Sequence, residues 1–131
     1  MVSNSATILN IKNIKSPVYF FKTANDFGEW LNEHHLKEKE IQLGYYKKKS
    51  NKYNYSWSET VDQGLCYGWI DGIVKTIDDI SYTRRFTPRR LKSNWSDVNI
   101  KKADNLIREG MMKEAGIKAY ERRSKSKKPK K

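Results

Sequence analysis

The sequence predicts an α+β protein in which a small antiparallel sheet packs with four helices. Segments with apolar residues at helical spacing alternate with a few short β-rich runs. Two of these runs follow one another over about residues 73–86 with only a tight connection between them, which predicts an antiparallel hairpin. The 131 residues suit a single domain, and 4 Trp, 8 Tyr and 4 Phe provide large side chains for its core.

Composition divides the chain into three parts. Residues 1–16 are polar and irregular, so we expect a flexible N-terminal lead-in before a domain that covers residues 17–121. Residues 122–131, RRSKSKKPKK, include seven basic and no acidic residues, and they lack the apolar side chains needed to fold. Without this disordered basic tail the formal net charge falls from +12 to +5, so the predicted domain is only mildly basic.

Local signals place a strand, a helix and a second strand at the start of the domain. The run VYFF at residues 18–21 is β-prone, and Thr23 follows it as a candidate N-cap. The helix predicted next has an apolar face at helical spacing, formed by Phe27, Trp30, Leu31 and His34. Residues 40–46, EIQLGYY, alternate between two faces, as in a half-buried strand.

A second helix is predicted to begin at Ser56 or Ser58. Glu59 stands three residues after Ser56, which is the spacing of a capping box. The expected buried stripe recurs every four residues and consists of Val61, Leu65 and Trp69. Either Gly68 or Gly72 then provides the backbone freedom that lets the chain leave the helix.

The hairpin and two further helices complete the predicted order. The hairpin strands lie at 73–77 and 80–86, and a two-residue turn at Asp78–Asp79 joins them. Ser93 or Ser96 caps the third helix. Its expected inner face is formed by Val98, Ile100, Ala103, Leu106 and Ile107. A short fourth helix, KEAGIKAYERR, precedes the tail.

Residues 65–72, LCYGWIDG, contain the first candidate site residues. Trp69 either packs in the core or forms one wall of a pocket. Asp71 either bonds backbone amides at a turn, as aspartates often do, or faces an arginine across that pocket. Cys66 is the single cysteine, and no motif links a histidine to it, so we expect a buried and inert thiol.

Residues 84–99, RRFTPRRLKSNWSDVN, place arginines just before the predicted start of a helix. A helix N-terminus offers unpaired N–H groups, serines add hydroxyl donors, and arginine adds a planar fork that suits carboxylate or phosphate. One interpretation is an anion-binding corner formed, with Trp69 and Asp71, by Arg89, Ser93, Trp95, Ser96 and Asn99. In the other interpretation Ser96 only caps the helix and Trp95 packs beside it. Arg89 then pairs with Asp71 and joins the loop to the sheet.

Three motifs stand in order at residues 67–72 (YGWIDG), 86–90 (FTPRR) and 93–99 (SNWSDVN). Single positions around them extend the pattern, namely Trp30, Leu31, His34, His35, Leu106, Gly110, Met112, Ala115 and Gly116. Over about residues 18–121 this set resembles the YdeI/OmpD-associated family, also called the bacteriocin-protection family. The departures are few: Tyr67 replaces a common Phe, Gly64 a larger helix former, and Met111 an Arg.

The resemblance implies a small protein linked to protection against bacteriocins or antimicrobial peptides, with no established catalytic activity. We therefore expect a non-catalytic binding or stress-protection protein whose pocket takes a small anionic ligand. No stretch approaches the roughly 20 apolar residues that a membrane-spanning helix needs. The N-terminus also lacks the pattern of a signal peptide. We expect a protein without a membrane span, located in the cytoplasm.

Two other functions are kept as alternatives. Nucleic-acid binding is the first, with phosphate contacts from Arg84, Arg85, Arg90 and Lys92 of the RRFTPRR segment and from Lys125, Lys127 and Lys128 of the tail. A basic tail by itself gives only weak, sequence-independent binding. An enzyme is the least favoured function, because the sequence shows no Ser–His–Asp arrangement, metal-ligand cluster or glycine-rich phosphate loop. We therefore expect no cofactor and no metal.

Overall fold

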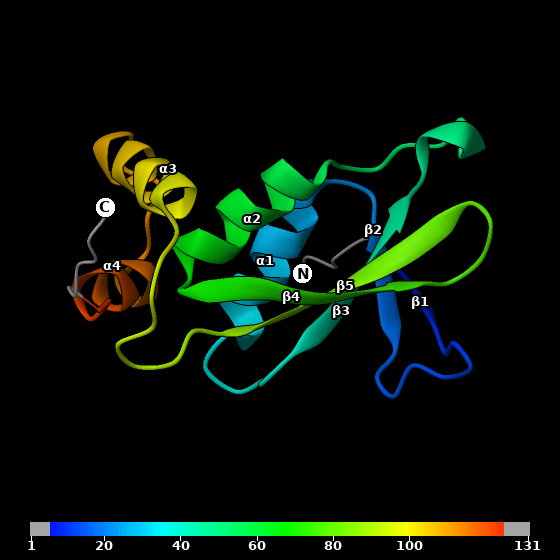
Figure 1. Ribbon diagram of the computed structural model, residues 1–131, viewed down its shortest axis with the longest axis horizontal. Helices are drawn as coiled ribbons and strands as arrows, with labels where there is room; N and C mark the ends of the chain where they lie inside the picture. The colour runs from blue at the N-terminus through cyan, green and yellow to red at the C-terminus, as the bar shows by residue number, and fades with distance from the viewer. Residues whose placement is uncertain (1–5, 125–131) are drawn as a thin grey trace, which may run out of the picture.

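A computed structural model describes residues 6–124, and in this range four α-helices accompany a five-stranded sheet (Figure 1). The elements in chain order are β1 (Ala6–Leu9), β2 (Val18–Phe21), α1 (Ala24–His34), β3 (Ile41–Tyr46), a short 3-10 helix η1 (Lys48–Ser50), α2 (Trp57–Cys66), β4 (Trp69–Thr76), β5 (Ser81–Pro88), α3 (Asp97–Arg108) and α4 (Glu114–Glu121). The α+β class and the four helices predicted from the sequence are confirmed.

The sheet is mixed, with the strand order β1-β2-β3-β5-β4. Three of its pairings are antiparallel, as predicted, but β2 and β3 run parallel. The cause is α1, which follows β2 and carries the chain back to the end of the sheet where β3 begins. A helical crossover of this kind joins parallel strands. The prediction of an antiparallel sheet is therefore wrong for the pair β2 and β3.

The predicted hairpin is confirmed as β4 and β5, which pair from Trp69 opposite Pro88 to Thr76 opposite Tyr82. Its connection covers residues 77–80, so the predicted two-residue turn is wrong. Asp78 explains the wider loop. Its carboxylate accepts hydrogen bonds from the backbone N–H of Ile80 at 3.0 Å and from the hydroxyl of Ser81 at 2.8 Å.

Strand β1 lies inside the N-terminal segment that was predicted to be an irregular lead-in. It pairs antiparallel with β2, from Ala6 opposite Phe21 to Leu9 opposite Val18. Its run ATIL is only four residues long, and the polar residues around it hide the β-prone signal. The rest of the lead-in, residues 10–16, is also described, and Ile14 there packs against Val18 and Phe20. The first residues of the predicted tail, 122–124, contact the domain, where the backbone N–H of Ser124 donates to the carbonyl of Ser93 at 2.9 Å. Residues 1–5 and 125–131 lie outside the described part of the chain.

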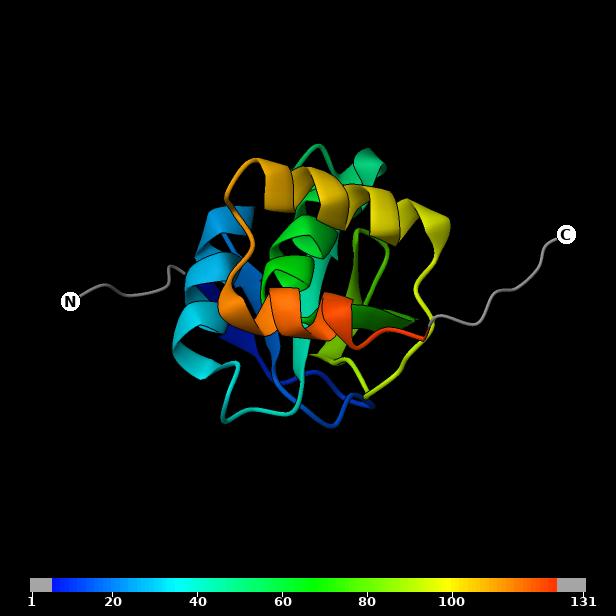
Figure 2. The ribbon, with the colours of Figure 1, turned by 90° about the vertical axis from the view of Figure 1, so that its left-hand side faces the viewer.

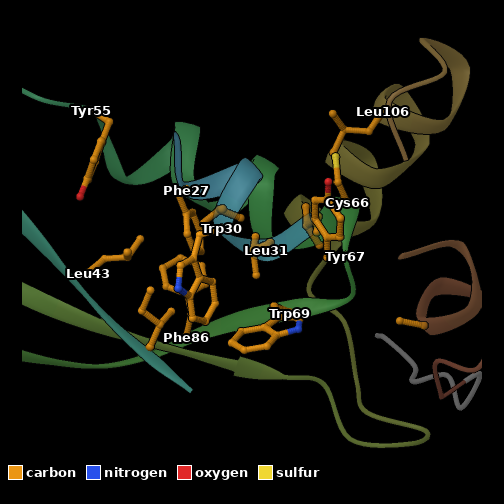
Figure 3. Packing of buried hydrophobic residues seen from close by; sticks show 14 of the residues in the cluster. Phe27, Trp30, Leu31, Leu43, Tyr55, Cys66, Tyr67, Trp69, Phe86 and Leu106 are labelled. Atoms are coloured by element: carbon orange, nitrogen blue, oxygen red, sulfur yellow. The ribbon is translucent and has the colours of Figure 1, made fainter. Parts of the chain in front are cut away.

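The helices are grouped at one face and one end of the sheet. Helices α1 and α2 lie against one face, and α3 and α4 gather beyond the end where β4 begins (Figures 1 and 2). The core fills the space between α1, α2 and the sheet (Figure 3). There the ring centroids of Phe27 and Phe86 lie 5.1 Å apart, and those of Trp30 and Trp69 lie 5.9 Å apart in an edge-to-face arrangement.

Trp69 is the first residue of β4 and not part of a helical stripe, which corrects the predicted length of the second helix. Helix α2 ends at Cys66, and Gly68 then adopts a left-handed conformation with a φ of 77°. Glycine takes this conformation without steric cost, so the chain turns here from helix to strand. Trp69 enters the core directly after this turn and is 2% exposed.

Only part of the predicted inner face of α3 is buried. Ala103 and Leu106 are buried and Ile100 is partly buried, whereas Val98 is 60% exposed and Ile107 is 38% exposed. Helix α3 packs against α2 and α4 at the end of the sheet. A helix in that position buries only a narrow apolar stripe. The wider inner face predicted from the sequence is therefore wrong at Val98 and Ile107.

Candidate functional site

Arg89 is the centre of the candidate site. Its backbone N–H donates to the carbonyl of Gly68 at 2.9 Å, which holds the loop after β5 against the turn before β4. Its guanidinium carbon lies 3.9 Å from the centroid of the Trp95 ring, and its Nη1 donates to the hydroxyl of Ser93 at 3.4 Å. The structure thus brings together Arg89, Ser93 and Trp95, three of the seven residues of the predicted anion-binding corner. Trp95 is also buried in the core, as the packing interpretation predicts.

The other two nitrogens of the Arg89 guanidinium have no hydrogen-bond acceptor among residues 6–124. The side chain is only 7% exposed, and both Nε and Nη2 are buried. These two nitrogens share one edge of the planar guanidinium, where their N–H bonds run parallel and can bind two oxygens of one oxyanion. Trp95 Nε1 is also buried without an acceptor in this part of the chain. The site therefore has buried donors without acceptors among the described residues.

Burial lowers the pKa of Arg89 to about 10, and the negative charge of Asp71 acts in the opposite direction. The guanidinium nevertheless stays positively charged at neutral pH. A buried charge with unmatched donors is unfavourable for folding, and such groups are concentrated at functional sites.

Arg89 lines an open cleft of about 600 Å³, called here the Arg89 cleft. Its walls come from the segment after α1, the turn between α2 and β4, the end of β5, and α4. The lining residues are His35, Leu36, Tyr67, Gly68, Trp69, Pro88, Arg89, Lys113, Glu114, Ala115, Lys118, Ala119 and Arg122. Of the predicted site residues, Trp69 and Arg89 line this cleft, and Ser93 and Trp95 support Arg89 from outside it.

The contribution of α4 to the cleft was missed by the sequence analysis. Three cations, Lys113, Lys118 and Arg122, line the cleft from this helix or its ends, and one carboxylate accompanies them. That carboxylate, Glu114, forms an ion pair with Lys118 at 3.2 Å. The signal available in the sequence was the small residue Gly116, because a helix with a small residue on one face can approach its neighbour closely.

Gly116 fixes the position of α4 and hence of the cleft wall. A Cβ at this residue would lie 2.4 Å from the carbonyl oxygen of Cys66 and 2.6 Å from that of Leu65. Both are backbone atoms at the end of α2, so they cannot rotate away. The backbone N–H of Lys113 also donates to the carbonyl of Cys66 at 3.0 Å, which joins the same two segments.

We expect Gly116→Ala to lower the free energy of unfolding by about 1–3 kcal/mol, as is typical of overpacking. Gly28→Ala is the matched control. The three atoms nearest to its new Cβ all belong to the flexible side chain of Gln63, which can move aside. Urea denaturation followed by circular dichroism measures both variants. An equal loss in the two variants would contradict the close contact between α4 and α2.

Asp71 faces an arginine, but that arginine is Arg84 and not Arg89, and the pair does not line the Arg89 cleft. It lies within β4, where its Oδ2 accepts hydrogen bonds from Trp57 Nε1 at 2.8 Å and from Arg84 Nη1 at 3.3 Å. The guanidinium of Arg84 also lies 5.2 Å from the centroid of the Trp57 ring. Asp71 therefore joins α2 to β5, and it acts on Arg89 only through its charge.

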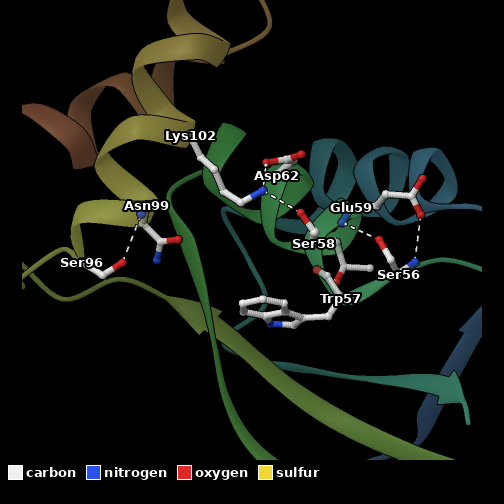
Figure 4. A network of polar contacts seen from close by, with 9 residues as sticks. Ser56, Trp57, Ser58, Glu59, Asp62, Ser96, Asn99 and Lys102 are labelled. Carbon is white, nitrogen blue, oxygen red and sulfur yellow. Dashed lines mark hydrogen bonds and ion pairs between the residues drawn. The ribbon is translucent and has the colours of Figure 1, made fainter.

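Ser96 and Asn99 belong to the start of α3 and do not line the Arg89 cleft (Figure 4). The Ser96 hydroxyl accepts a hydrogen bond from the backbone N–H of Asn99 at 3.1 Å, so the capping interpretation of Ser96 is confirmed. Lys102, further along α3, bonds Asp62 at 2.9 Å and Ser58 at 2.8 Å. These contacts hold α3 against α2 and leave Ser96 and Asn99 outside the site.

The basic residues of the RRFTPRR segment do not form one continuous surface. Arg84 bonds Asp71 on the helix-covered face of the sheet. Arg85 is its neighbour in the strand and points to the opposite face, where its Nε donates to Glu40 at 2.5 Å. Arg90 and Lys92 are exposed. The remaining predicted phosphate contacts, Lys125, Lys127 and Lys128, lie outside the described residues.

A second hollow of about 490 Å³ adjoins the Arg89 cleft and contains Cys66. Burial raises the pKa of the Cys66 thiol to about 11, and the charge of Asp62 adds to the effect. The thiol is therefore protonated at neutral pH and a poor nucleophile. Within residues 6–124 no group of three or more His, Cys, Asp or Glu side chains could hold a metal ion. No helix in the same range is long and apolar enough to cross a membrane.

A comparison with known families gives one match. A family model described as "Domain of unknown function (DUF8412)" covers residues 19–119, which include every described element from β2 to α4 except the ends of the first and last. No curated protein and no solved structure matches the chain significantly. The Arg89 cleft lies within the matched range, apart from Arg122.

Proposed function

Since this chain belongs to the DUF8412 family, whose domain has no assigned function, we propose its role from the Arg89 cleft. The protein is a small binding protein that holds an anionic small molecule on Arg89. The observation that carries this proposal is the buried Nε and Nη2 edge of Arg89, which has no acceptor among the described residues.

The donor chemistry of Arg89 supports an oxyanion. A buried donor without an acceptor costs about 1–3 kcal/mol, and more when the group is charged. An oxyanion that accepts from both nitrogens at once removes this cost and supplies the opposite charge. Ser93 and Trp95 hold the guanidinium in one plane, so little side-chain freedom is lost on binding.

The charges around the Arg89 cleft support the same sign of ligand. Besides Arg89, the lining contains Lys113, Lys118 and Arg122, against the single carboxylate of Glu114. An excess of positive charge in a concave site attracts anions and raises their local concentration.

The residues along the cleft support binding without chemistry. The described lining contains no Ser, Thr or Cys side chain that His35 could activate. The Nδ1 of His35 lies 2.7 Å from the carbonyl oxygen of Leu31, and that contact orients the ring. The stress-protection role implied by the resemblance to the YdeI/OmpD-associated family stays a prediction beside this proposal.

Anion titration tests the proposal. Isothermal titration calorimetry of the full chain uses acetate and inorganic phosphate as probes. We expect at least one of them to bind. Arg89→Lys keeps the charge but removes the planar fork, so it should weaken binding by about tenfold or more. Arg90→Lys is the matched control, because Arg90 is adjacent, exposed and outside the cleft. Binding that is lost equally in the two variants would contradict a site on Arg89.

A further inference from the structure

We propose that the ligand of the Arg89 cleft is an organic monocarboxylate with an apolar body. This inference rests on the anion-binding function proposed above and specifies the class of ligand. The carboxylate binds the Nε and Nη2 edge of Arg89, and the apolar body lies along Leu36, Tyr67 and the small residues of α4.

The buried part of the site matches one carboxylate. Arg89 offers one positive charge and two free, parallel N–H donors, and a carboxylate offers one negative charge and two oxygens in the same plane. A phosphate dianion would keep an unmatched charge and further oxygens beside a single buried cation. The other cations of the lining are exposed to water, and Lys118 is already paired with Glu114.

The rest of the cleft matches an apolar body. Its volume of about 600 Å³ is within the range of sites for small organic molecules, about 300–1,000 Å³. Leu36 is 86% exposed, and it lines the cleft together with Tyr67 and Trp69, which are largely buried. Ala115 and Ala119 give the α4 side of the cleft small, apolar side chains. An exposed leucine at the edge of a hollow is stabilised when an apolar ligand covers it.

The burial of the donor edge adds a requirement for entry. Both Nε and Nη2 of Arg89 are shielded from solvent, so an oxyanion reaches them only when a side chain of the wall rotates away. An apolar body then covers the apolar surface that this movement exposes, whereas an inorganic anion leaves that surface in contact with water.

Calorimetry of the full chain with matched probes tests the inference. The probes are 3-phenylpropionate, acetate, inorganic phosphate and the uncharged 3-phenylpropanamide. We expect 3-phenylpropionate to bind about tenfold or more tightly than acetate, because its ring buries apolar surface that acetate lacks. The amide and phosphate should bind more weakly than 3-phenylpropionate. Leu36→Ser should reduce the advantage of 3-phenylpropionate over acetate by about threefold or more.

Leu91→Ser is the matched control, because Leu91 is likewise exposed, at 70%, but lies outside the Arg89 cleft. It should leave the advantage of 3-phenylpropionate unchanged. Acetate and 3-phenylpropionate binding equally, or phosphate binding most tightly, would overturn the inference and leave the anion-binding function standing. Amide binding as tight as 3-phenylpropionate would also overturn it. Failure of every anion to bind would refute the anion-binding function itself.

Discussion

Arg89→Met is expected to abolish anion binding and to leave the free energy of unfolding at or above that of the unmodified protein. Loss of a bidentate charged donor should weaken binding of 3-phenylpropionate by about 100-fold or more. The free energy of unfolding should be unchanged or rise by up to about 2 kcal/mol, since an apolar side chain of similar length removes a buried charge with two unmatched donors. Calorimetry and urea denaturation measure the two effects.

Arg84→Met provides the contrast for that experiment. Arg84 likewise lies over a tryptophan and has a buried Nε without an acceptor among residues 6–124, but its Nη1 donates to Asp71 at 3.3 Å. Removing it takes one hydrogen-bond partner and the countercharge from a largely buried carboxylate. We expect a loss of about 1–3 kcal/mol in the free energy of unfolding. An equal loss in Arg89→Met would show that Arg89 is structural, and the proposed function would lose its support.

Trp69→Ala is expected to lower the free energy of unfolding by about 3–5 kcal/mol, the typical cost of deleting a large buried aromatic side chain. Trp69 is 2% exposed, packs edge-to-face against Trp30 of α1, and lines the Arg89 cleft. The substitution therefore removes packing between α1 and β4 and leaves a cavity under the site. Urea denaturation followed by circular dichroism measures the loss.

Trp57→Ala is the matched control for this stability prediction. Trp57 is 44% exposed, and its indole N–H donates to Asp71 at 2.8 Å. Its removal should cost about 1.5 kcal/mol, the lower end of the range for one hydrogen bond to a charged group, because the site is partly exposed. A cost for Trp57→Ala as large as that for Trp69→Ala would contradict the placement of Trp69 in the core.

Elements with local signals could be predicted from the sequence. The caps Thr23, Ser56 and Ser96 each accept a bond from a backbone N–H three residues on, so a short stretch of sequence specifies each helix start. The parallel pairing of β2 and β3 depends on where α1 returns the chain, which no short stretch specifies. Strand β1 was missed because its stability comes from pairing with β2 and not from its own four residues.

The same distinction applies to the candidate site. Arg89, Ser93 and Trp95 lie within seven residues of one another in the sequence, so their association in one loop could be predicted. The α4 wall could not, because it depends on contacts between distant segments. The pairing of Asp71 with Arg84 in place of Arg89 follows from the register of β4 against β5, and from the bulge between Asp71 and Val74. Residue types alone do not determine that choice.

The side-chain Nε–H resonance of Arg89 in a ¹⁵N–¹H NMR spectrum gives the most direct test of the central claim, that Arg89 holds the ligand. Comparison with Arg89→Lys assigns the resonance. On titration with 3-phenylpropionate we expect this signal to shift more than that of any other arginine, because the carboxylate accepts a hydrogen bond from this N–H. A titration that shifts Arg90 or Arg122 and leaves Arg89 unchanged would contradict the account.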